Sequence, residues 1–207
     1  MSITNNLYLI AAICGNFYQE SGVNPGIWEN LTVGDPGFGL GQWTDNPPIV
    51  MRRTDLFNWL DANGYARDSG EGQMQFLVYE NLWIADNIYG QSDYNTLHDY
   101  LHTTDTNMVL LVEEFMFHWE GINDGTYNNR YSWANYFLDL FQNDPGTRQP
   151  WTAANDYITQ AQTDNNALLI KDFFTGTTPP TPPGPGPIPY HRRKHGLPPW
   201  LIHKLTQ

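Results

Sequence analysis

The sequence NFYQESG at residues 16–22, followed after a turn-rich stretch by GFGLGQWT at residues 37–44, decides the fold class. Just before and through the first motif, apolar residues recur at steps of three and four over residues 5–20, which predicts a helix with one buried face. The Ser-Gly pair that follows ends this helix. Closely spaced glycines then interrupt the periodicity, and together with Asn-Pro-Gly and Asp-Pro-Gly turns they predict a small β-hairpin region.

Helical spacing returns beyond Pro48. The predicted helices cover residues 50–63, 71–89, 106–119, 130–142 and 151–174, and the last has a polar break at residues 160–166. The pairs Asn63-Gly64 and Tyr89-Gly90 indicate C-terminal stops. The fold class is therefore α+β and mostly helical, with a small β-hairpin region and an extended proline-rich C-terminal tail.

The composition is that of a globular domain with a substantial core. The chain has 207 residues, of which 40 % are hydrophobic and 14 % aromatic. Its single cysteine, Cys14, lies among apolar neighbours, which predicts a buried, inert thiol and no internal disulfide. No stretch approaches the roughly 20 apolar residues that span a bilayer. The first residues lack the basic region of a signal peptide.

Charge divides the chain into an acidic body and a basic tail. The net charge is −12, but up to Asp172 there are six basic and 22 acidic residues, and the remainder carries +4. A body this acidic repels phosphate backbones, so we expect no nucleic-acid partner.

Composition and charge together divide the chain into three regions: a globular body at residues 1–175, a proline-rich linker at 176–189 and a basic peptide at 190–207. The linker reads GTTPPTPPGPGPIP, and at about 3.1 Å per residue an extended spacer of this length reaches about 40 Å. The basic peptide combines positive charge with apolar anchors, which favours a docking segment; a disordered tail with incidental charge is an equal alternative.

Glu20 is the first candidate for chemistry. A carboxylate in the last turn of a buried helix faces the negative end of the helix dipole, which disfavours its ionised form. Desolvation in a cleft acts in the same direction, so the carboxyl group can keep a proton near neutral pH, as a general acid must. The alternative is a solvated glutamate at a helix end.

The two opening motifs together resemble the phage tail lysozyme family, a branch of the lysozyme-like superfamily that also holds goose-type lysozymes and soluble lytic transglycosylases. The resemblance covers roughly residues 5–142. The residues that carry it are Gln19-Glu20-Ser21-Gly22, the Asn24-Pro25 turn, Gly39-Leu40-Gly41-Gln42-Trp43, the block at 73–77 with Glu80, and Phe117-His118-Trp119-Glu120 with Arg130 and Tyr136.

The resemblance implies a lysozyme-like fold and cleavage of the β-1,4 bond between N-acetylmuramic acid and N-acetylglucosamine in peptidoglycan. Glu20 matches the family's catalytic glutamate, and its expected task is to protonate the glycosidic oxygen. Around it, Gly41 would let the backbone approach a sugar closely, and Gln42 would hydrogen-bond an N-acetyl group. Trp43 would stack on a pyranose ring.

A second catalytic carboxylate is assigned to Asp45, with Asp35 and Glu29 behind it. Such a group would act as a base on water or as a nucleophile. The alternative for Asp45 is a turn residue, since similar family members often have glycine there. Without a base, intramolecular attack would give the anhydro sugar of a lytic transglycosylase.

Two further residues complete the expected substrate contacts, namely Tyr18 and Glu120. For Glu120 a buried ion pair with Arg130 is the alternative. Glu80 is expected to make a hydrogen bond from its helix face to the hairpin region. The histidines show no metal-ligand spacing, because His98 and His102 lack a third ligand, so we expect neither metal nor cofactor.

The expected biological setting is a phage virion. The tail would bind phage tail proteins, and the enzyme would act at the tail tip on the host cell wall. One alternative is an endolysin that accumulates in the host cytoplasm until lysis. Another, of a different class, is a non-catalytic glycan-binding or structural tail protein.

Overall fold

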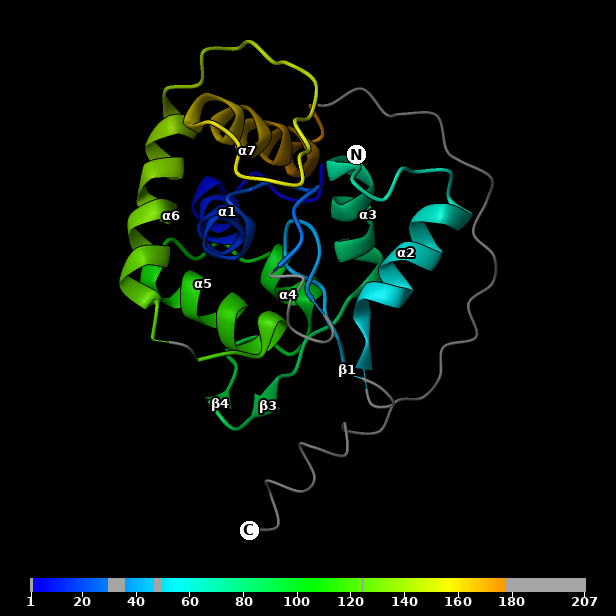
Figure 1. Cartoon of the computed structure of the whole chain (residues 1–207). Helices are drawn as coiled ribbons and strands as arrows, with labels where there is room; N and C mark the ends of the chain where they lie inside the picture. The colour runs from blue at the N-terminus through cyan, green and yellow to red at the C-terminus, as the bar shows by residue number, and fades with distance from the viewer. Residues whose placement is uncertain (1, 30–35, 47–49, 124, 178–207) are drawn as a thin grey trace.

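The computed structural model describes residues 2–29, 36–46, 50–123 and 125–177 (Figure 1). The α-helices are α1 (Leu7–Ser21), α2 (Arg52–Ala62), α3 (Gly70–Glu80), α4 (Leu97–Leu101), α5 (Met108–Phe115), α6 (Tyr127–Gln142) and α7 (Gln160–Thr175), and the π-helical turn η1 (Met116–Glu120) continues α5. The antiparallel strand pairs are β1 (Asp45–Asn46) with β2 (Val50–Met51), and β3 (Asp86–Asn87) with β4 (Gly90–Gln91). The predicted class, α+β and mostly helical, is confirmed.

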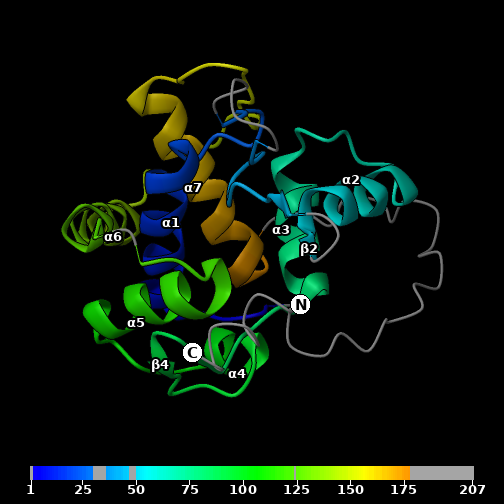
Figure 2. The ribbon, with the colours of Figure 1, turned by 60° about the horizontal axis from the view of Figure 1, so that its bottom comes forward.

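Helix α1 forms the centre of the core. Every residue from Leu9 to Phe17 is buried, including Cys14 as predicted, and helices α5, α6 and α7 pack around it (Figure 2). Helix α6 crosses α1 at Gly15, where an added Cβ atom would lie 2.6 Å from the carbonyl oxygen of Arg130. Only glycine permits this approach, which brings the side chain of Arg130 beside the C-terminal half of α1.

The end of α1 follows the sequence prediction. Gly22 adopts a left-handed conformation with φ of 65°, and its N–H donates to the carbonyl oxygens of Phe17 and Tyr18. This glycine cap ends the helix directly after Glu20 and Ser21. The side chain of Glu20 therefore projects from the last turn.

The glycine-rich stretch is a tight turn rather than a continuous hairpin. Residues 37–43 form only isolated bridges, and the short ladder lies further along, between β1 and β2. Gln73 of α3 is fully buried and holds the turn: its Oε1 accepts from the N–H of Leu40 at 2.9 Å, and its Nε2 donates to the carbonyl of Pro25 at 2.7 Å.

Two helix predictions were wrong in extent. The helix expected over 71–89 ends at Glu80, because Asn81 adopts a left-handed conformation; the β3–β4 pair follows, with Gly90 inside it. The helix expected over 151–174 begins only at Gln160, where Thr159 and Gln162 form a capping box, so the predicted polar break at 160–166 is helical. Helix α4 was not predicted.

The two ends of the described body meet. The backbone N–H groups of Ile3 and Thr4 both donate to the carbonyl oxygen of Phe174, at 2.8 and 3.0 Å. Helix α7 ends one residue later, at Thr175. The predicted linker and basic peptide fall almost wholly on residues 178–207, which lie outside the described residues. Among the helices that the structure describes, none has the length and apolar character to cross a membrane.

Candidate active site

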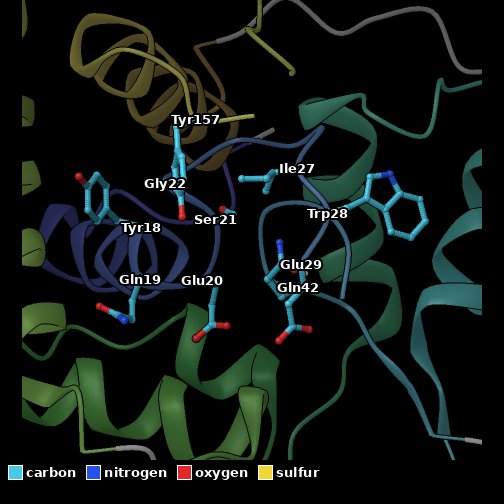
Figure 3. Close-up of a pocket in the computed structure, with 10 residues that line it drawn as sticks. All are labelled: Tyr18, Gln19, Glu20, Ser21, Gly22, Ile27, Trp28, Glu29, Gln42 and Tyr157. Atoms are coloured by element: carbon cyan, nitrogen blue, oxygen red, sulfur yellow. The ribbon is translucent and has the colours of Figure 1, made fainter. Parts of the chain in front are cut away.

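A pocket of about 280 Å³ opens at the C-terminal end of α1. Its walls come from three segments: the end of α1, the glycine-rich turn region and the stretch that precedes α7. The lining residues are Tyr18, Gln19, Glu20, Ser21, Gly22, Ile27, Trp28, Glu29, Gln42 and Tyr157. Figure 3 shows Glu20 projecting into this space, with Glu29 and Gln42 on the opposite side.

Glu20 and Glu120 share one arginine. Nη2 of Arg130 lies 2.5 Å from Oε1 of Glu20, and Nη1 of the same guanidinium lies 2.7 Å from Oε2 of Glu120. The side chain of Arg130 is fully buried, that of Glu120 is 3 % exposed, and that of Glu20 is 20 % exposed. Of the two carboxylates, Glu20 is therefore the one open to the pocket.

The neighbouring elements fix the guanidinium in place. Its Nη1 also donates to Oδ1 of the buried Asn16 on α1 at 2.8 Å, and its Nε donates to Oγ1 of Thr126 at 2.9 Å. Glu120 reaches it from the π-helical turn η1, which Gly121 ends in a left-handed conformation. Such π-helical turns recur at functional sites because they displace side chains from the register of an α-helix.

Burial is the main influence on the pKa of Glu120. Desolvation raises the pKa of Glu120 well above its usual value, the negative charge of Glu20 raises it further, and Arg130 acts against both. The carboxyl group is almost fully enclosed beside Arg130 and does not line the pocket. The alternative given for Glu120, a buried ion pair with Arg130, is confirmed, and its expected contact with substrate stays a prediction.

Asp45 is part of the scaffold. One carboxylate oxygen accepts from the N–H of Thr54 at 3.0 Å; the other accepts from the Thr54 hydroxyl at 2.7 Å and from Arg53 at 3.0 Å. Burial acts to raise the pKa of Asp45, but the hydrogen bonds from Thr54 and the charge of Arg53 outweigh it and lower the pKa. Asp45 thus secures the first turn of α2 and does not line the pocket; its assignment as a catalytic carboxylate stays a prediction.

Trp43 and Gly41 are also packed in the interior of the protein. Trp43 is fully buried against Phe76 and Trp119, and its indole N–H donates to Oε2 of Glu80 at 3.4 Å, the expected bond from Glu80 to this region. The ring presents no open face in this structure, and its stacking on a pyranose stays a prediction. At Gly41 an added Cβ atom would lie 2.4 Å from the Trp119 ring, so packing, rather than a sugar, requires glycine there.

The remaining expected residues line the pocket. Gln42 has a positive φ of 46°, donates from Nε2 to the carbonyl of Gly39 at 2.9 Å, and its buried Oε1 has no partner among the described residues. Tyr18 stacks one face on Trp133 at a centroid distance of 3.5 Å. Glu29 accepts from the N–H of Gly37 at 3.0 Å through Oε2. Asp35 lies outside the described residues.

Sequence reasoning missed two features of the site. The first is the bond from Arg130 to Glu20, which depends on the approach of two helices 110 residues apart in sequence. The second is Tyr157, which was assigned to a helix that does not form there. Across the residues that the structure describes, no cluster of three or more histidine, cysteine, aspartate or glutamate side chains is placed to hold a metal ion.

Comparison with known proteins shows similarity to one protein family and to a phage protein. A family model described as phage tail lysozyme matches residues 6–141 of the chain. The chain is also 41 % identical over 80 residues to Morphogenesis protein 1 of Bacillus phage B103. That alignment covers 38 % of this chain and 19 % of the relative, so the chain matches less than a fifth of that relative's length.

Proposed function

The chain belongs to the phage tail lysozyme family, and on that premise we propose that it is a peptidoglycan muramidase with Glu20 as its general acid. The bond cleaved is the β-1,4 link between N-acetylmuramic acid and N-acetylglucosamine. The observation that carries the proposal is the position of Glu20, in the last turn of α1 and partly open to a pocket (Figure 3).

Glycoside cleavage requires a proton at the leaving oxygen, because expulsion of an alkoxide from an oxocarbenium-like transition state is unfavourable. Glu20 lies at the pocket wall, which supports this role. Arg130 alone would favour the ionised form of the carboxyl group and so oppose proton donation.

Glu120 changes this balance. Two carboxylates share a single guanidinium, so when both are ionised the cluster of three carries a net negative charge in a largely buried place. The charge of Glu20 raises the pKa of Glu120, and in a coupled pair of carboxylates a proton bound by either one relieves the repulsion. A proton held by the pair relieves this repulsion, and Arg130 keeps the donor aligned in either state.

Glu29 is the second carboxylate of the proposed mechanism. It faces Glu20 across the pocket in Figure 3, and its side chain is anchored through the N–H of Gly37. In this position it would activate water for attack on the sugar, as the base of an inverting hydrolase does, or attack directly, as the nucleophile of a retaining one does. On the same side, Gln42 would bind an N-acetyl group of the substrate.

The test uses purified peptidoglycan sacculi and measures released reducing ends and the masses of the soluble muropeptides. Glu20→Gln removes the proton donor with little change in shape, and we expect it to lower the rate at least about 100-fold while the protein still binds walls. Glu29→Gln should also abolish hydrolysis. Glu113→Gln, on α5 and away from the pocket, is the matched control and should retain full activity.

The products decide between the possible reactions. Reducing N-acetylmuramic acid ends support hydrolysis with Glu29 as base or nucleophile. Anhydro ends that persist in Glu29→Gln would refute this role of Glu29 and support the transglycosylase outcome. Equal effects of wild type and Glu20→Gln on walls would overturn the enzymatic proposal in favour of a glycan-binding tail protein.

We also propose that the enzyme is carried by the virion and acts on the host wall from the tail tip. Support comes from the tail lysozyme family and from a relative named for morphogenesis. Deletion of residues 179–207 should leave wall hydrolysis intact but remove the protein from particles. Normal incorporation of the shortened protein would contradict docking through the tail, and absence of the full chain from particles would favour an endolysin.

A further inference from the structure

We propose that Tyr157 is a saccharide-binding platform of the pocket, contributed by a segment that lies outside the matched lysozyme region. The ligand is an N-acetylhexosamine ring of the glycan strand, and the inference therefore rests on the proposed function. The family match ends at residue 141, whereas Tyr157 lies in the irregular segment 151–159 that precedes α7.

The exposure of Tyr157 is unlike that of any other large apolar side chain that the structure describes. It is 86 % exposed, whereas the other exposed members of this group are 36–49 % exposed. A single exposed aromatic side chain is common on protein surfaces, but Tyr157 is also one of the residues that line the pocket with Glu20. Figure 3 draws its side chain among those of the residues that line this pocket.

The backbone beside Tyr157 is hydrogen-bonded to Asn24, a fully buried residue of the turn after α1. Its Nδ2 donates to the carbonyls of Ala154 at 2.9 Å and Asp156 at 2.8 Å. Its Oδ1 accepts from the N–H of Ala154 at 3.1 Å and of Gly26 at 3.0 Å. These four bonds use the full capacity of the amide, which has two donor hydrogens and two acceptor sites.

Three further hydrogen bonds join the same regions. Oγ1 of Thr163 donates to the carbonyl of Gly22 at 3.0 Å, and Nδ2 of Asn166 donates to the carbonyls of Val23 at 2.9 Å and Thr152 at 2.8 Å. The turn that follows Glu20 and the segment that carries Tyr157 are thus fastened together. An exposed ring on a fixed backbone is pre-organised for a ligand.

The chemistry of the ring selects the ligand class. The C–H groups on one face of a pyranose pack on an aromatic ring, while the tyrosine hydroxyl remains free to hydrogen-bond sugar hydroxyl or amide groups. Tyrosine has only two side-chain torsions to order, so such a contact costs little conformational entropy. Because Tyr18 has one face covered by Trp133, Tyr157 is the more open of the two tyrosines at the pocket.

Binding is measured without turnover in the Glu20→Gln background, by calorimetric titration with a tetrasaccharide of alternating N-acetylglucosamine and N-acetylmuramic acid. We expect Tyr157→Ala to raise Kd about tenfold and Tyr157→Trp to keep Kd within about threefold of the parent. In the otherwise wild-type enzyme, Tyr157→Ala should raise KM on sacculi with little change in kcat. The matched control is Tyr79→Ala, which removes an exposed tyrosine of α3 that does not line the pocket.

A Kd for Tyr157→Ala within about twofold of the parent would overturn the inference. Absence of tetrasaccharide binding in the Glu20→Gln parent would overturn the inference as well. The proposed muramidase activity is tested separately, by hydrolysis of sacculi. A loss of affinity in Tyr79→Ala as large as that in Tyr157→Ala would also count against a specific platform. Unchanged thermal unfolding of Tyr157→Ala would show that the effect arises from the ligand contact.

Discussion

The guanidinium of Arg130 lies 2.5 Å from the carboxylate of Glu20, although the two residues are 110 positions apart in the sequence. This contact exists because α6 crosses α1 at Gly15, a place with no room for a side chain. The position of the proposed acid is therefore set by the packing of two helices as well as by its own backbone.

Replacement of Arg130 by methionine should destabilise the protein by about 3–5 kcal/mol, since two carboxylates would lose their buried partner. Urea unfolding at neutral pH measures this loss. Arg67→Met is the control, because Arg67 and Asp61 form an ion pair whose side chains are both about half exposed; its cost should be below about 1 kcal/mol. Equal costs for the two variants would contradict the buried network.

The raised pKa of Glu120 predicts a specific pH dependence of stability. Between the unfolded value of about 4.5 and the higher folded value, the folded state binds more protons, so stability falls as the pH rises. Glu120→Gln lacks this titration. The free energy of unfolding of wild type minus that of Glu120→Gln should therefore decrease as the pH rises above 4.5, by at most about 1.4 kcal/mol per pH unit.

Urea unfolding of both proteins across pH 4.5 to about 7.5 tests this dependence. A difference that grows with pH would mean that Arg130 keeps Glu120 ionised in the folded state. That result would remove the proton-sharing argument for Glu20.

Asp45→Asn tests whether Asp45 stabilises the fold or takes part in catalysis. The carboxylate stabilises the start of α2, so we expect a loss of about 1–2 kcal/mol in unfolding free energy with wall hydrolysis near the wild-type rate. Because the folded pKa of Asp45 is lowered, its contribution is present above its usual value of 3.8 and is lost as the pH falls through the folded value. The difference between wild type and Asp45→Asn should shrink in acid. Loss of hydrolysis with unchanged stability would restore a catalytic role.

Asn24→Asp should loosen the wall that carries Tyr157. The substitution keeps the shape of the side chain but directs a carboxylate oxygen at two carbonyl oxygens that now accept from the amide. We expect a destabilisation of about 2–3 kcal/mol and faster proteolysis within residues 151–159. Asn135→Asp, on the exposed face of α6, should change stability by less than about 0.5 kcal/mol. Unchanged protease resistance in Asn24→Asp would contradict this anchoring.

Local sequence signals predicted the elements that depend on local chemistry. The end of α1 was correct because a glycine in the left-handed region ends a helix wherever it occurs, and this alone placed Glu20 in a last turn. The helix expected across Asn81 failed because Leu82 and Ile88 fit a helical spacing, whereas the backbone turns at the asparagine.

The surroundings of several predicted site residues depend on long-range packing, which local sequence signals do not predict. A tryptophan beside a glycine-rich turn can face either a ligand or the core, and Trp43 faces the core because Trp119 and Phe76 close over it. Asp45 became a scaffold residue through Thr54, nine positions away. Tyr157 lies at the pocket because Asn24, together with Thr163 and Asn166, joins its segment to the turn after α1.

The buried thiol of Cys14 can report when the central part of α1 opens. Burial raises the pKa of its thiol well above the usual range, and the side chain is fully enclosed one residue before the crossing with α6. A thiol-reactive dye can therefore attach only when this helix opens. The rate at which the dye labels Cys14 would therefore measure the opening of the helix that ends in Glu20, with no engineered probe in the protein.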